Sequence, residues 1–507
     1  MRIYLSLSIA LITIFNSYSQ GSYHMLHYTA NKEYVLNNFI KTYDQKYLTT
    51  GFVVYGINQY YSLISKIDQA GHPEWIKLYY DTTSFICHDL SETPDSNYIL
   101  CGSLMDSSYT NSIALLKIDS QGNIIWNKRF QSNINETANN ITINTDGSYT
   151  LCGAGNVSNM YYFTIIRIDS FGNLIWTKNY ERPFSYSDNT DILSLDNNSN
   201  IVTVKYDTTI LVLNIDQWGS IIWSNTYSYN DIYINSISKT FDNNIIILGG
   251  RYNDILFKIN TNGDIIWAKK YNSLNQYGVY YSSITNTSDS CSVFTSTHFI
   301  PMIDSMNISI IKIDNNGDTL WTRKYGNTDY YIGGEIHKIA EDFDSGYILM
   351  GKYTDVNRYG YILKTNHTGY SNCYNLPTDF SIENIVVQKN TISLVEYNTT
   401  YTQYINNIIP YNQYLLDSLI CFYSNINTNS FNNKQITVFP NPSSKEINII
   451  CKNMQEIELI NENGQLIEQY NVNSDKFVIN VANRNKGIYF VKVETINGNV
   501  IEKIVVN

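Results

Sequence analysis

The sequence predicts an all-β protein, a seven-bladed β-propeller of four-stranded blades followed by a small C-terminal β-sandwich. Three observations lead to this prediction. One pattern recurs seven times, and a second turn signal between its copies has aspartates 46 to 55 residues apart. Six of the seven tryptophans occupy the same place in the first pattern. No segment has the 3.6-residue apolar period of a long amphipathic helix. Self-similarity at this period is typical of propellers, whose blades each contain four strands.

The first part of the repeat reads Lys-Ile-Asp, then Gly after two residues and Trp after three more. One copy contains Lys117, Asp119, Gly122 and Trp126. A last copy keeps Lys364 and Gly369 but has no tryptophan. The tryptophans of the other six copies are Trp75, Trp126, Trp176, Trp223, Trp267 and Trp321.

A second signal, a turn aspartate followed by an apolar run that often ends in glycine, lies midway between these copies. Asp146 to Gly153 is one example. Each period therefore holds four short runs rich in Ile, Val, Tyr and Thr, which are residues favoured in strands. In the third repeat these runs are 162–168, 174–180, 190–195 and 200–205.

The Asp-x-x-Gly spacing suits a type I turn, which favours Asp at its first position and Gly at its fourth. The tryptophan then falls on the following strand, where we expect its ring to pack between blades. The repeat is similar to quinoprotein-type propeller repeats, in which a turn and a tryptophan hold neighbouring blades together. It departs from them by having one residue fewer between Asp and Gly and no adjacent cysteine pair. The resemblance implies only the packing role of the tryptophan.

The start of the chain predicts export. Arg2 precedes the apolar run 3–15, and the small residues Ser17 and Ser19 follow, which is typical of a signal peptide at 1–19. The run is shorter than the ~20 residues of a membrane span, and no later segment is long and apolar enough for one. The net charge of −11, without a basic block, argues against a nucleic-acid partner.

The propeller is expected over 20–372, with a linker or small degenerate β segment at 373–433. Among the seven cysteines, Cys101 and Cys152 occur at the same repeat position and are expected in the core. Cys373 and Cys421 flank the segment between the two domains, and in an oxidising compartment they could form a disulfide.

Residues 434–507 differ in character from the repeats. The alternating runs 446–451, 456–460, 477–481, 488–493 and 500–506 predict strands, and Asn463-Gly464 and Asn497-Gly498 suit type I′ hairpin turns. They suggest a β-sandwich of about 70 residues.

This region resembles the type A C-terminal sorting domain of the type IX secretion system. The resemblance rests on four motifs in the same order as in that family. They are Phe439-Pro440-Asn441-Pro442, the stretch 458–465 with Gly464 in it, Lys486-Gly487-Ile488-Tyr489, and the closing residues around Lys503. It implies that the type IX machinery carries the protein across both membranes of a Gram-negative cell. The domain is then removed, or the protein is attached to surface lipopolysaccharide, so the expected location is extracellular or the outer cell surface.

No motif predicts a cofactor, a metal or a common enzyme activity. The sequence has no phosphate-binding glycine loop, no Gly-x-Ser-x-Gly and no His-Glu-x-x-His. Glu341, Asp342 and Asp344 cluster beside a predicted turn, where a solvated hairpin tip is favoured over a calcium site. The function expected from fold and tag is binding of a glycan or a protein by the propeller. The alternative is a secreted hydrolase or lyase whose carboxylates converge at the channel.

Overall fold

The protein is described by a computed structural model in which no helix occurs among the described residues, so the all-β prediction is confirmed. In particular, those residues contain no helix that could span a membrane. The chain divides into two compact units, Met1–Tyr423 and Ser424–Asn507. The described residues are 22–28, 34–56, 59–80, 84–158, 160–182, 190–206, 208–230, 232–250, 253–273, 277–279, 282–300, 305–325, 334–354, 358–371, 375–376, 380–396, 400–405, 408–412, 416–423, 436–461, 466–495 and 498–506.

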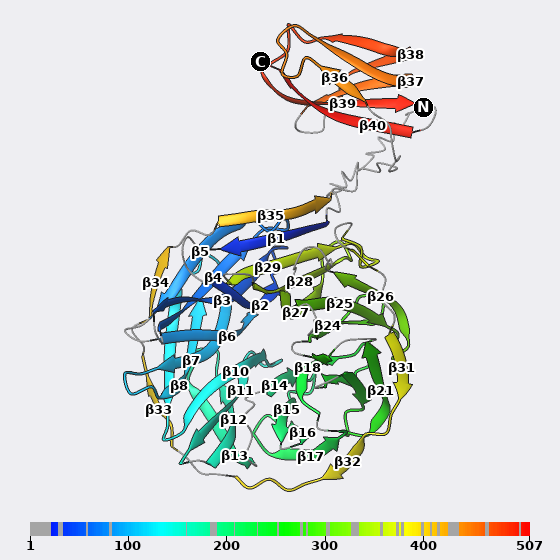
Figure 1. Ribbon diagram of the computed structural model, residues 1–507. Coiled ribbons are helices and arrows are strands. Elements are labelled where there is room, and N and C mark those ends of the chain that lie inside the picture. Colours follow the sequence, from blue (N-terminus) through cyan, green and yellow to red (C-terminus); the bar gives the residue numbers. More distant parts are fainter. Residues whose placement is uncertain are drawn as a thin grey trace, which may run out of the picture. The chain divides into compact units, whose positions relative to one another are not determined.

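The first unit consists of seven antiparallel blades arranged in a ring (Figure 1), whose innermost strands line a central channel. Blade 1 contains β2 (Tyr34–Lys41), β3 (Tyr47–Gly56), β4 (Gln59–Ile67) and β5 (Pro73–Tyr80). Blade 2 contains β6 (Ser84–Glu92), β7 (Tyr98–Met105), β8 (Asn111–Ile118) and β9 (Ile124–Gln131). Blade 3 contains β10 (Asn135–Ile143), β11 (Tyr149–Val157), β12 (Met160–Ile168) and β13 (Leu174–Arg182). Blade 4 contains β14 (Thr190–Ser194), β15 (Asn200–Tyr206), β16 (Thr209–Ile215) and β17 (Ile221–Ser228).

The remaining blades follow the same order from the channel outward. Blade 5 contains β18 (Ile234–Lys239), β19 (Ile245–Gly249), β20 (Asp254–Ile259) and β21 (Ile265–Ser273). Blade 6 contains β22 (Tyr277–Val279), β23 (Ile284–Asn286), β24 (Ser292–Ile300), β25 (Ser305–Ile313) and β26 (Thr319–Tyr325). Blade 7 contains β27 (Gly334–Glu341), β28 (Tyr347–Thr354), β29 (Arg358–Thr365) and β1 (Ser22–Tyr28).

The N-terminal strand closes the ring. β1 pairs with β29 and forms the outer strand of blade 7, so this blade combines the two ends of the repeat region. Its Tyr23 is opposite Lys364, as Trp75 is opposite Lys66 in blade 1 and Trp126 is opposite Lys117 in blade 2. The tryptophan that the seventh repeat lacks is therefore replaced in register by a residue from the other end of the unit.

The core lies between blades. Each apolar cluster of this unit joins two neighbouring sheets, as where Leu48 and Ile64 of blade 1 pack with Leu100 and Leu116 of blade 2. The two middle strands of a blade are buried on both faces, as the almost continuous burial of β8 and β12 shows. Stability therefore depends on how each blade docks on the next.

A tryptophan and a glycine make the repeated contact between blades. The ring on the outer strand of one blade lies against the turn glycine of the next, where a Cβ would be 2.7 to 3.2 Å from the ring. These glycines also have positive φ, which other residues rarely adopt. The indole N–H of Trp176 donates to the carbonyl of Gln217 at 2.9 Å in the same turn. The glycines are Gly122, Gly172, Gly219, Gly263, Gly317 and Gly369.

A tyrosine four residues after the tryptophan reinforces this contact in several blades. Such alternate residues share one face of a strand. The hydroxyls of Tyr79, Tyr227 and Tyr271 each donate to the carbonyl of the same turn glycine at 2.6 Å. The first residue of the turn fixes its shape, since Asp119 Oδ1 accepts the amides of Gln121 and Asn123 at 2.9 and 2.8 Å.

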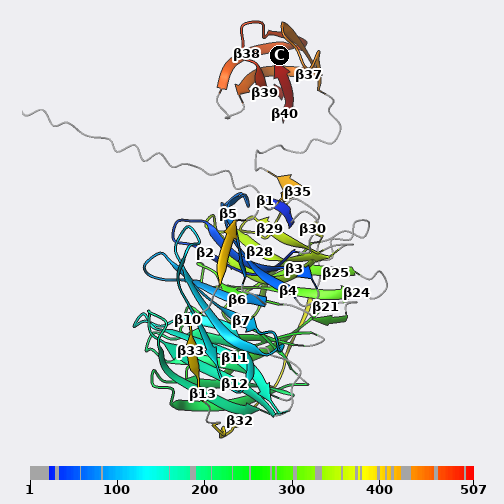
Figure 2. The same ribbon diagram turned by 90° about the vertical axis from the view of Figure 1, so that its left-hand side faces the viewer.

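The segment 375–423 forms a belt around the blades (Figures 1 and 2). Its pieces pair in reverse order with the outer strands of blades 6, 5, 4, 3, 2, 1 and 7. They are β30 (Asn375–Leu376), β31 (Phe380–Asn384), β32 (Gln388–Thr391), a bridge from Glu396 to Tyr180, β33 (Thr402–Tyr404), β34 (Ile409–Asn412) and β35 (Leu416–Tyr423). Every outer edge strand thus has a backbone partner, which protects it from pairing with another chain.

The belt residue Tyr401 makes a polar contact between blades. The Tyr401 hydroxyl donates to Glu136 Oε2 at 2.8 Å, and Thr164 and Ser132 donate to the same carboxylate at 2.8 Å. Burial nevertheless raises the pKa of Glu136 to about 7. Glu136 is therefore held as a buried acid close to its titration point at neutral pH.

The second unit has one hydrogen-bonded sheet around an apolar core. Its strands are β36 (Thr437–Phe439), β37 (Glu446–Asn461), β38 (Leu466–Asn480), β39 (Gly487–Thr495) and β40 (Gly498–Val506). The two runs expected at 446–451 and 456–460 are one long strand, because β37 changes register between Ile450 and Glu456 instead of ending. Asn441 joins the first residues of the domain to its last strand, accepting from Val505 N at 2.8 Å and donating to Lys503 O at 2.7 Å.

Trp176→Ala should destabilise the protein by about 3 to 5 kcal/mol, because it removes a packed ring and leaves a space between blades 3 and 4. Urea unfolding at neutral pH measures this loss. Trp218→Ala is the matched control, since Trp218 is 70% exposed and its removal should change stability by less than about 0.5 kcal/mol. Equal unfolding midpoints for the wild type and Trp176→Ala would contradict the packing role.

Glu136→Gln should flatten the pH dependence of stability. The folded-state pKa of Glu136 is above the unfolded value of 4.5, so its stabilising contribution is complete below pH 4.5 and is lost as the pH rises through 7. The loss is about 3 kcal/mol for a shift of this size. Free energies of unfolding at pH 4.5 and pH 8 compare the variant with wild type and with Glu74→Gln, which changes an exposed carboxylate. Identical pH slopes in all three proteins would refute the assignment.

Candidate binding site in the central channel

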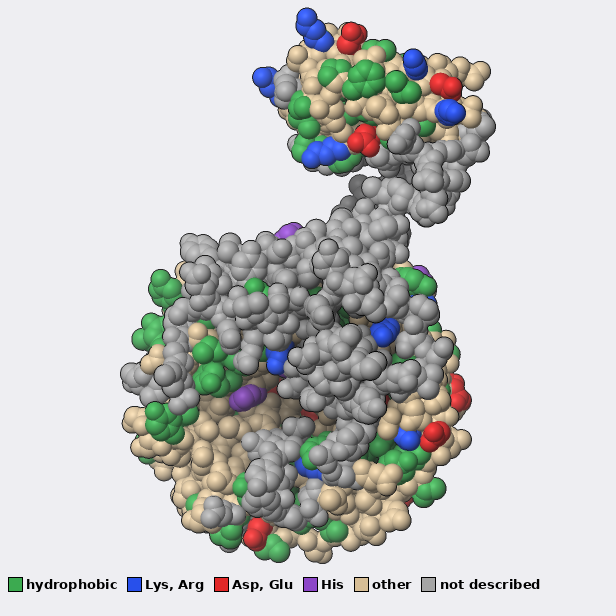
Figure 3. All heavy atoms as spheres, in the orientation of Figure 1, with side chains coloured by type: hydrophobic (Ala, Val, Ile, Leu, Met, Phe, Trp, Pro, Cys, Tyr) green, Lys and Arg blue, Asp and Glu red, His purple; other side chains and the backbone are tan. Residues whose placement is uncertain are grey.

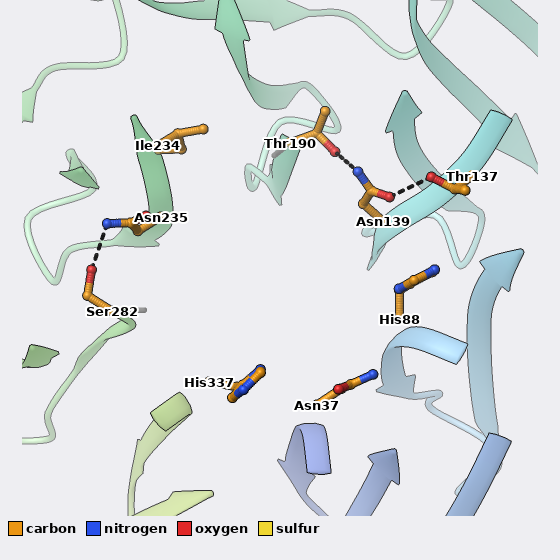
Figure 4. A pocket seen from close by; sticks show the side chains of 9 residues that line it. All are labelled: Asn37, His88, Thr137, Asn139, Thr190, Ile234, Asn235, Ser282 and His337. Atoms are coloured by element: carbon orange, nitrogen blue, oxygen red, sulfur yellow. Dashed lines mark hydrogen bonds between the residues drawn. The ribbon is translucent and has the colours of Figure 1, made fainter. Parts of the chain in front are cut away.

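Seven polar residues line one level of the channel, and each comes from a different blade. With Thr137 and Ile234 they enclose a cavity of about 470 Å³. Figure 4 shows their side chains around one shared space, and Figure 3 shows a hollow near the middle of one face with mostly polar or backbone atoms and a histidine. We call these residues the channel ring: Asn37, His88, Asn139, Thr190, Asn235, Ser282 and His337.

Bulges in the innermost strands present these residues. In β2 the pairing with β3 shifts between Leu36 and Asn38, so Asn37 is the extra residue. The same shift occurs at His88, Asn139, Asn235 and His337. A bulge re-aims the side chain of its extra residue, which explains why positions on five different strands all face the channel.

Glycines on the neighbouring strands make room for the bulges. A Cβ on Gly102 would be 1.9 Å from the carbonyl oxygen of Ile86, and one on Gly153 would be 1.9 Å from that of Thr137. Gly51 and Gly249 are equally tight against the preceding strand. These are the glycines that end the apolar run of the repeat. They were therefore the sequence signal for the channel ring, although the sequence alone did not identify its members.

The channel ring is hydrogen-bonded in part and keeps polar atoms facing the cavity. Asn139 accepts from Thr137 Oγ1 at 2.9 Å and donates to Thr190 Oγ1 at 3.2 Å. Asn235 donates to Ser282 Oγ at 2.8 Å. Burial lowers the pKa of His337 to about 4, so this imidazole is neutral at pH 7. The ring offers amides, hydroxyls and imidazoles, and contains no carboxylate.

In several blades, the residue that follows the channel-ring residue connects one blade to the next. Asp89 Oδ2 accepts Ile141 N at 2.9 Å, and Asp191 Oδ2 accepts Ile237 N at 3.0 Å, in each case from the following blade. Ser236 accepts Ile284 N at 3.4 Å in the same way. The side chains adjacent to the channel ring therefore hold the inner ends of neighbouring strands together.

Two of these connecting residues are carboxylates with raised pKa values. Burial raises the pKa of Asp191 to about 6 and raises that of Asp89, while the Lys338 ammonium lowers both. Both oxygens of each carboxylate already accept hydrogen bonds, Asp89 from Asn38 and Ile141 and Asp191 from Ile192 and Ile237. Their geometry is that of structural acceptors at the channel wall.

The residues singled out in the sequence lie elsewhere. The six tryptophans are on the outer strands, away from the innermost strands that form the channel ring. Asp342 and Asp344 pair with Lys364 at 2.6 and 3.3 Å, and Glu341 accepts Ser288 N at 2.7 Å. Among the described residues no three His, Cys, Asp or Glu side chains gather into a metal site. Cys373, Gly464 and the predicted signal peptide lie outside the described residues, and Cys421 is in β35.

A comparison with protein families finds one match. Residues 437–507 match the secretion system C-terminal sorting domain. The match includes Pro440, Asn441, Pro442, Gly487 and Lys503, and it confirms the resemblance to type IX sorting domains. The chain is a secreted protein that is attached to the cell surface or released outside the cell.

Solved structures give only distant similarity. A protein of unknown function from Bacteroides caccae is 12% identical, covering 58% of this chain and 93% of its own, with a TM-score of 0.32. The Dos1 propeller is 10% identical over 68% and 95%, with a TM-score of 0.38. A putative 6-phosphogluconolactonase from Bacteroides uniformis is 11% identical over 71% and 100%, with a TM-score of 0.39. These values are too low to transfer any activity. A comparison with curated proteins found no match.

Deletion of 434–507 should stop export at the periplasm, because the sorting domain is removed while the propeller and its belt stay intact. Cell fractionation and surface proteolysis of a type IX-competent cell measure this. Trp218→Ala in the full-length chain is the control and should reach the surface normally. Surface display of the truncated chain at the level of the control would contradict the role of the domain.

Proposed function

We propose that this protein is a secreted or surface-attached binding protein whose propeller channel holds a glycan. A signal peptide would direct it into the periplasm of a Gram-negative cell, and the type IX machinery would complete export. The observation that carries the proposal is the channel ring, which places one short polar side chain from each blade at a single level.

The chemistry of the ring suits a neutral, polyhydroxylated ligand. Amides and hydroxyls both donate and accept hydrogen bonds, which matches the mixed donor and acceptor character of sugar hydroxyls. The cavity volume is within the ~300 to 1,000 Å³ that small-molecule sites usually have. The ring has no carboxylate and His337 is neutral at pH 7, so it provides no strong field for a highly charged ligand.

The alternative, a hydrolase or lyase, would use Asp89 and Asp191. It receives less support, because all four carboxylate oxygens accept hydrogen bonds from protein groups. A general acid or base needs an oxygen within reach of the substrate proton. The raised pKa of Asp191 is explained by burial at a contact between blades 4 and 5.

The test is a glycan array with the full-length protein, followed by affinity measurements on a glycan that binds. Asn139→Ala and Asn235→Ala should each weaken binding about tenfold, because each removes a hydrogen bond worth about 1 to 1.5 kcal/mol. Asn316→Ala is the control, since Asn316 is exposed in a turn of blade 6 and should bind as wild type.

Three results would overturn the proposal. Absence of any bound glycan, or unchanged affinity in both ring variants, would exclude the channel ring as a glycan site. Release of reducing ends from a glycan by wild type, abolished in Asp191→Asn, would establish the hydrolase instead.

A further inference from the structure

Blade 4 departs from the repeat at one position on its third strand. Asn214, opposite Trp223, stands where the other blades have a cation opposite the aromatic residue of the outer strand. In blade 5 that cation is Lys258, whose Nζ lies 2.7 Å from Asp242 in its own blade and 2.5 Å from Asn315 Oδ1 in the next. The cations of the other blades are Lys66, Lys117, Arg167, Lys258, Lys312 and Lys364.

The shorter asparagine leaves a cavity of about 340 Å³ between blades 4 and 5. Its walls include Asp196 of the turn in blade 4 and Thr261 of the turn in blade 5. These residues correspond to Asp242 and Asn315 around Lys258, so the cavity is the room that a lysine side chain takes in the next blade. It is separate from the channel ring, with which it shares no lining residue.

The charge at this cavity is already balanced. Lys239 of blade 5 lies 2.6 Å from Asp196 and takes the place of the missing cation of blade 4. A cationic group of a ligand would therefore find the carboxylate of this turn already paired. The cavity is suited to a neutral polar molecule.

At this cavity, one buried polar atom has no partner among the described residues. Asn214 lines the cavity and is 5% exposed, and its Oδ1 accepts no hydrogen bond from the described residues. A buried acceptor without a donor costs about 1 to 3 kcal/mol. A hydroxyl group in the cavity would donate to it and remove that cost.

The remaining lining combines amides with an apolar wall. Asn197, Asn243 and Asn262 offer donors and acceptors, while Trp223 and Ile222 provide aromatic and aliphatic surface. A sugar presents the same two kinds of surface, hydroxyls at its edge and C–H groups on its face. An aromatic ring beside polar groups is suited to such an amphipathic ligand.

We propose that this cavity is a second ligand site, which binds one sugar residue with a hydroxyl donated to Asn214 Oδ1. The site does not depend on the channel proposal, because the two cavities share no lining residue.

Saturation-transfer NMR with the full-length protein tests the proposal, with free hexoses, N-acetylhexosamines and fucose as probes. We expect signal from at least one sugar in wild type. Asn214→Lys restores the cation of the repeat and fills the cavity, so it should reduce affinity at least tenfold. Asn214→Leu keeps the volume but removes the acceptor, and should reduce affinity similarly without lowering the melting temperature. The control Asn316→Lys, with the same charge change in an exposed turn, should bind as wild type.

Three outcomes would overturn the proposal. Absence of signal from every sugar would leave the cavity without this ligand class. Undiminished binding in both Asn214 variants would place the sugar elsewhere. Binding of N-acetyl-lysine amide in wild type that Asn214→Lys abolishes, without sugar binding, would show that the cavity accepts the amine of a partner protein.

Discussion

Contact between a tryptophan ring and a turn glycine sets the arrangement of this propeller. The ring needs a neighbour without a Cβ, and the turn needs a residue with positive φ, so glycine satisfies both demands at once. The contact always runs from the outer strand of one blade to the turn of the next. One blade supplies the tryptophan ring and the next blade supplies the glycine. The same contact geometry therefore repeats around the propeller until the last blade meets the first. β1 then places Tyr23 at the position that would otherwise lack an aromatic residue.

The contact between tryptophan and glycine holds the outer ends of the blades together. A different set of interactions holds their inner ends. In blade 2, for example, a bulge directs His88 into the channel, and the next residue, Asp89, accepts a hydrogen bond from blade 3. Channel-facing and structural positions thus alternate along one strand. Asp89 and Asp191 illustrate the consequence, since carboxylates near a channel are connectors between blades when both oxygens are taken by protein donors.

The blades were predictable because their determinants are local and repeated. In one copy, the turn and the tryptophan, Asp119, Gly122 and Trp126, lie within eight residues. The other copies repeat the same turn followed by a strand. The channel ring was not predictable in this way, because Asn, His, Thr and Ser alternate at its positions and only the glycine on the adjacent strand recurs. The belt was still harder to recognise. Two of its strands, β32 and β34, have four residues each and are mostly exposed, and belt strands pair through backbone groups, which leave no pattern in the side chains. The cavity at Asn214 is visible in sequence as a missing lysine, yet its meaning depends on Lys239 from the next blade.

The belt also has a consequence for the number of repeats. Tandem repeats can be gained or lost as whole units. Contacts between neighbouring blades do not by themselves fix the number of blades, because each blade contacts only the next. The belt is different, since seven successive pieces of one continuous segment pair with seven outer strands in fixed reverse order. With six repeats, one belt piece would have no outer strand to pair with. With eight repeats, the outer strand of one blade would have no belt piece. The pairing of the segment 375–423 therefore restricts this sequence to seven blades.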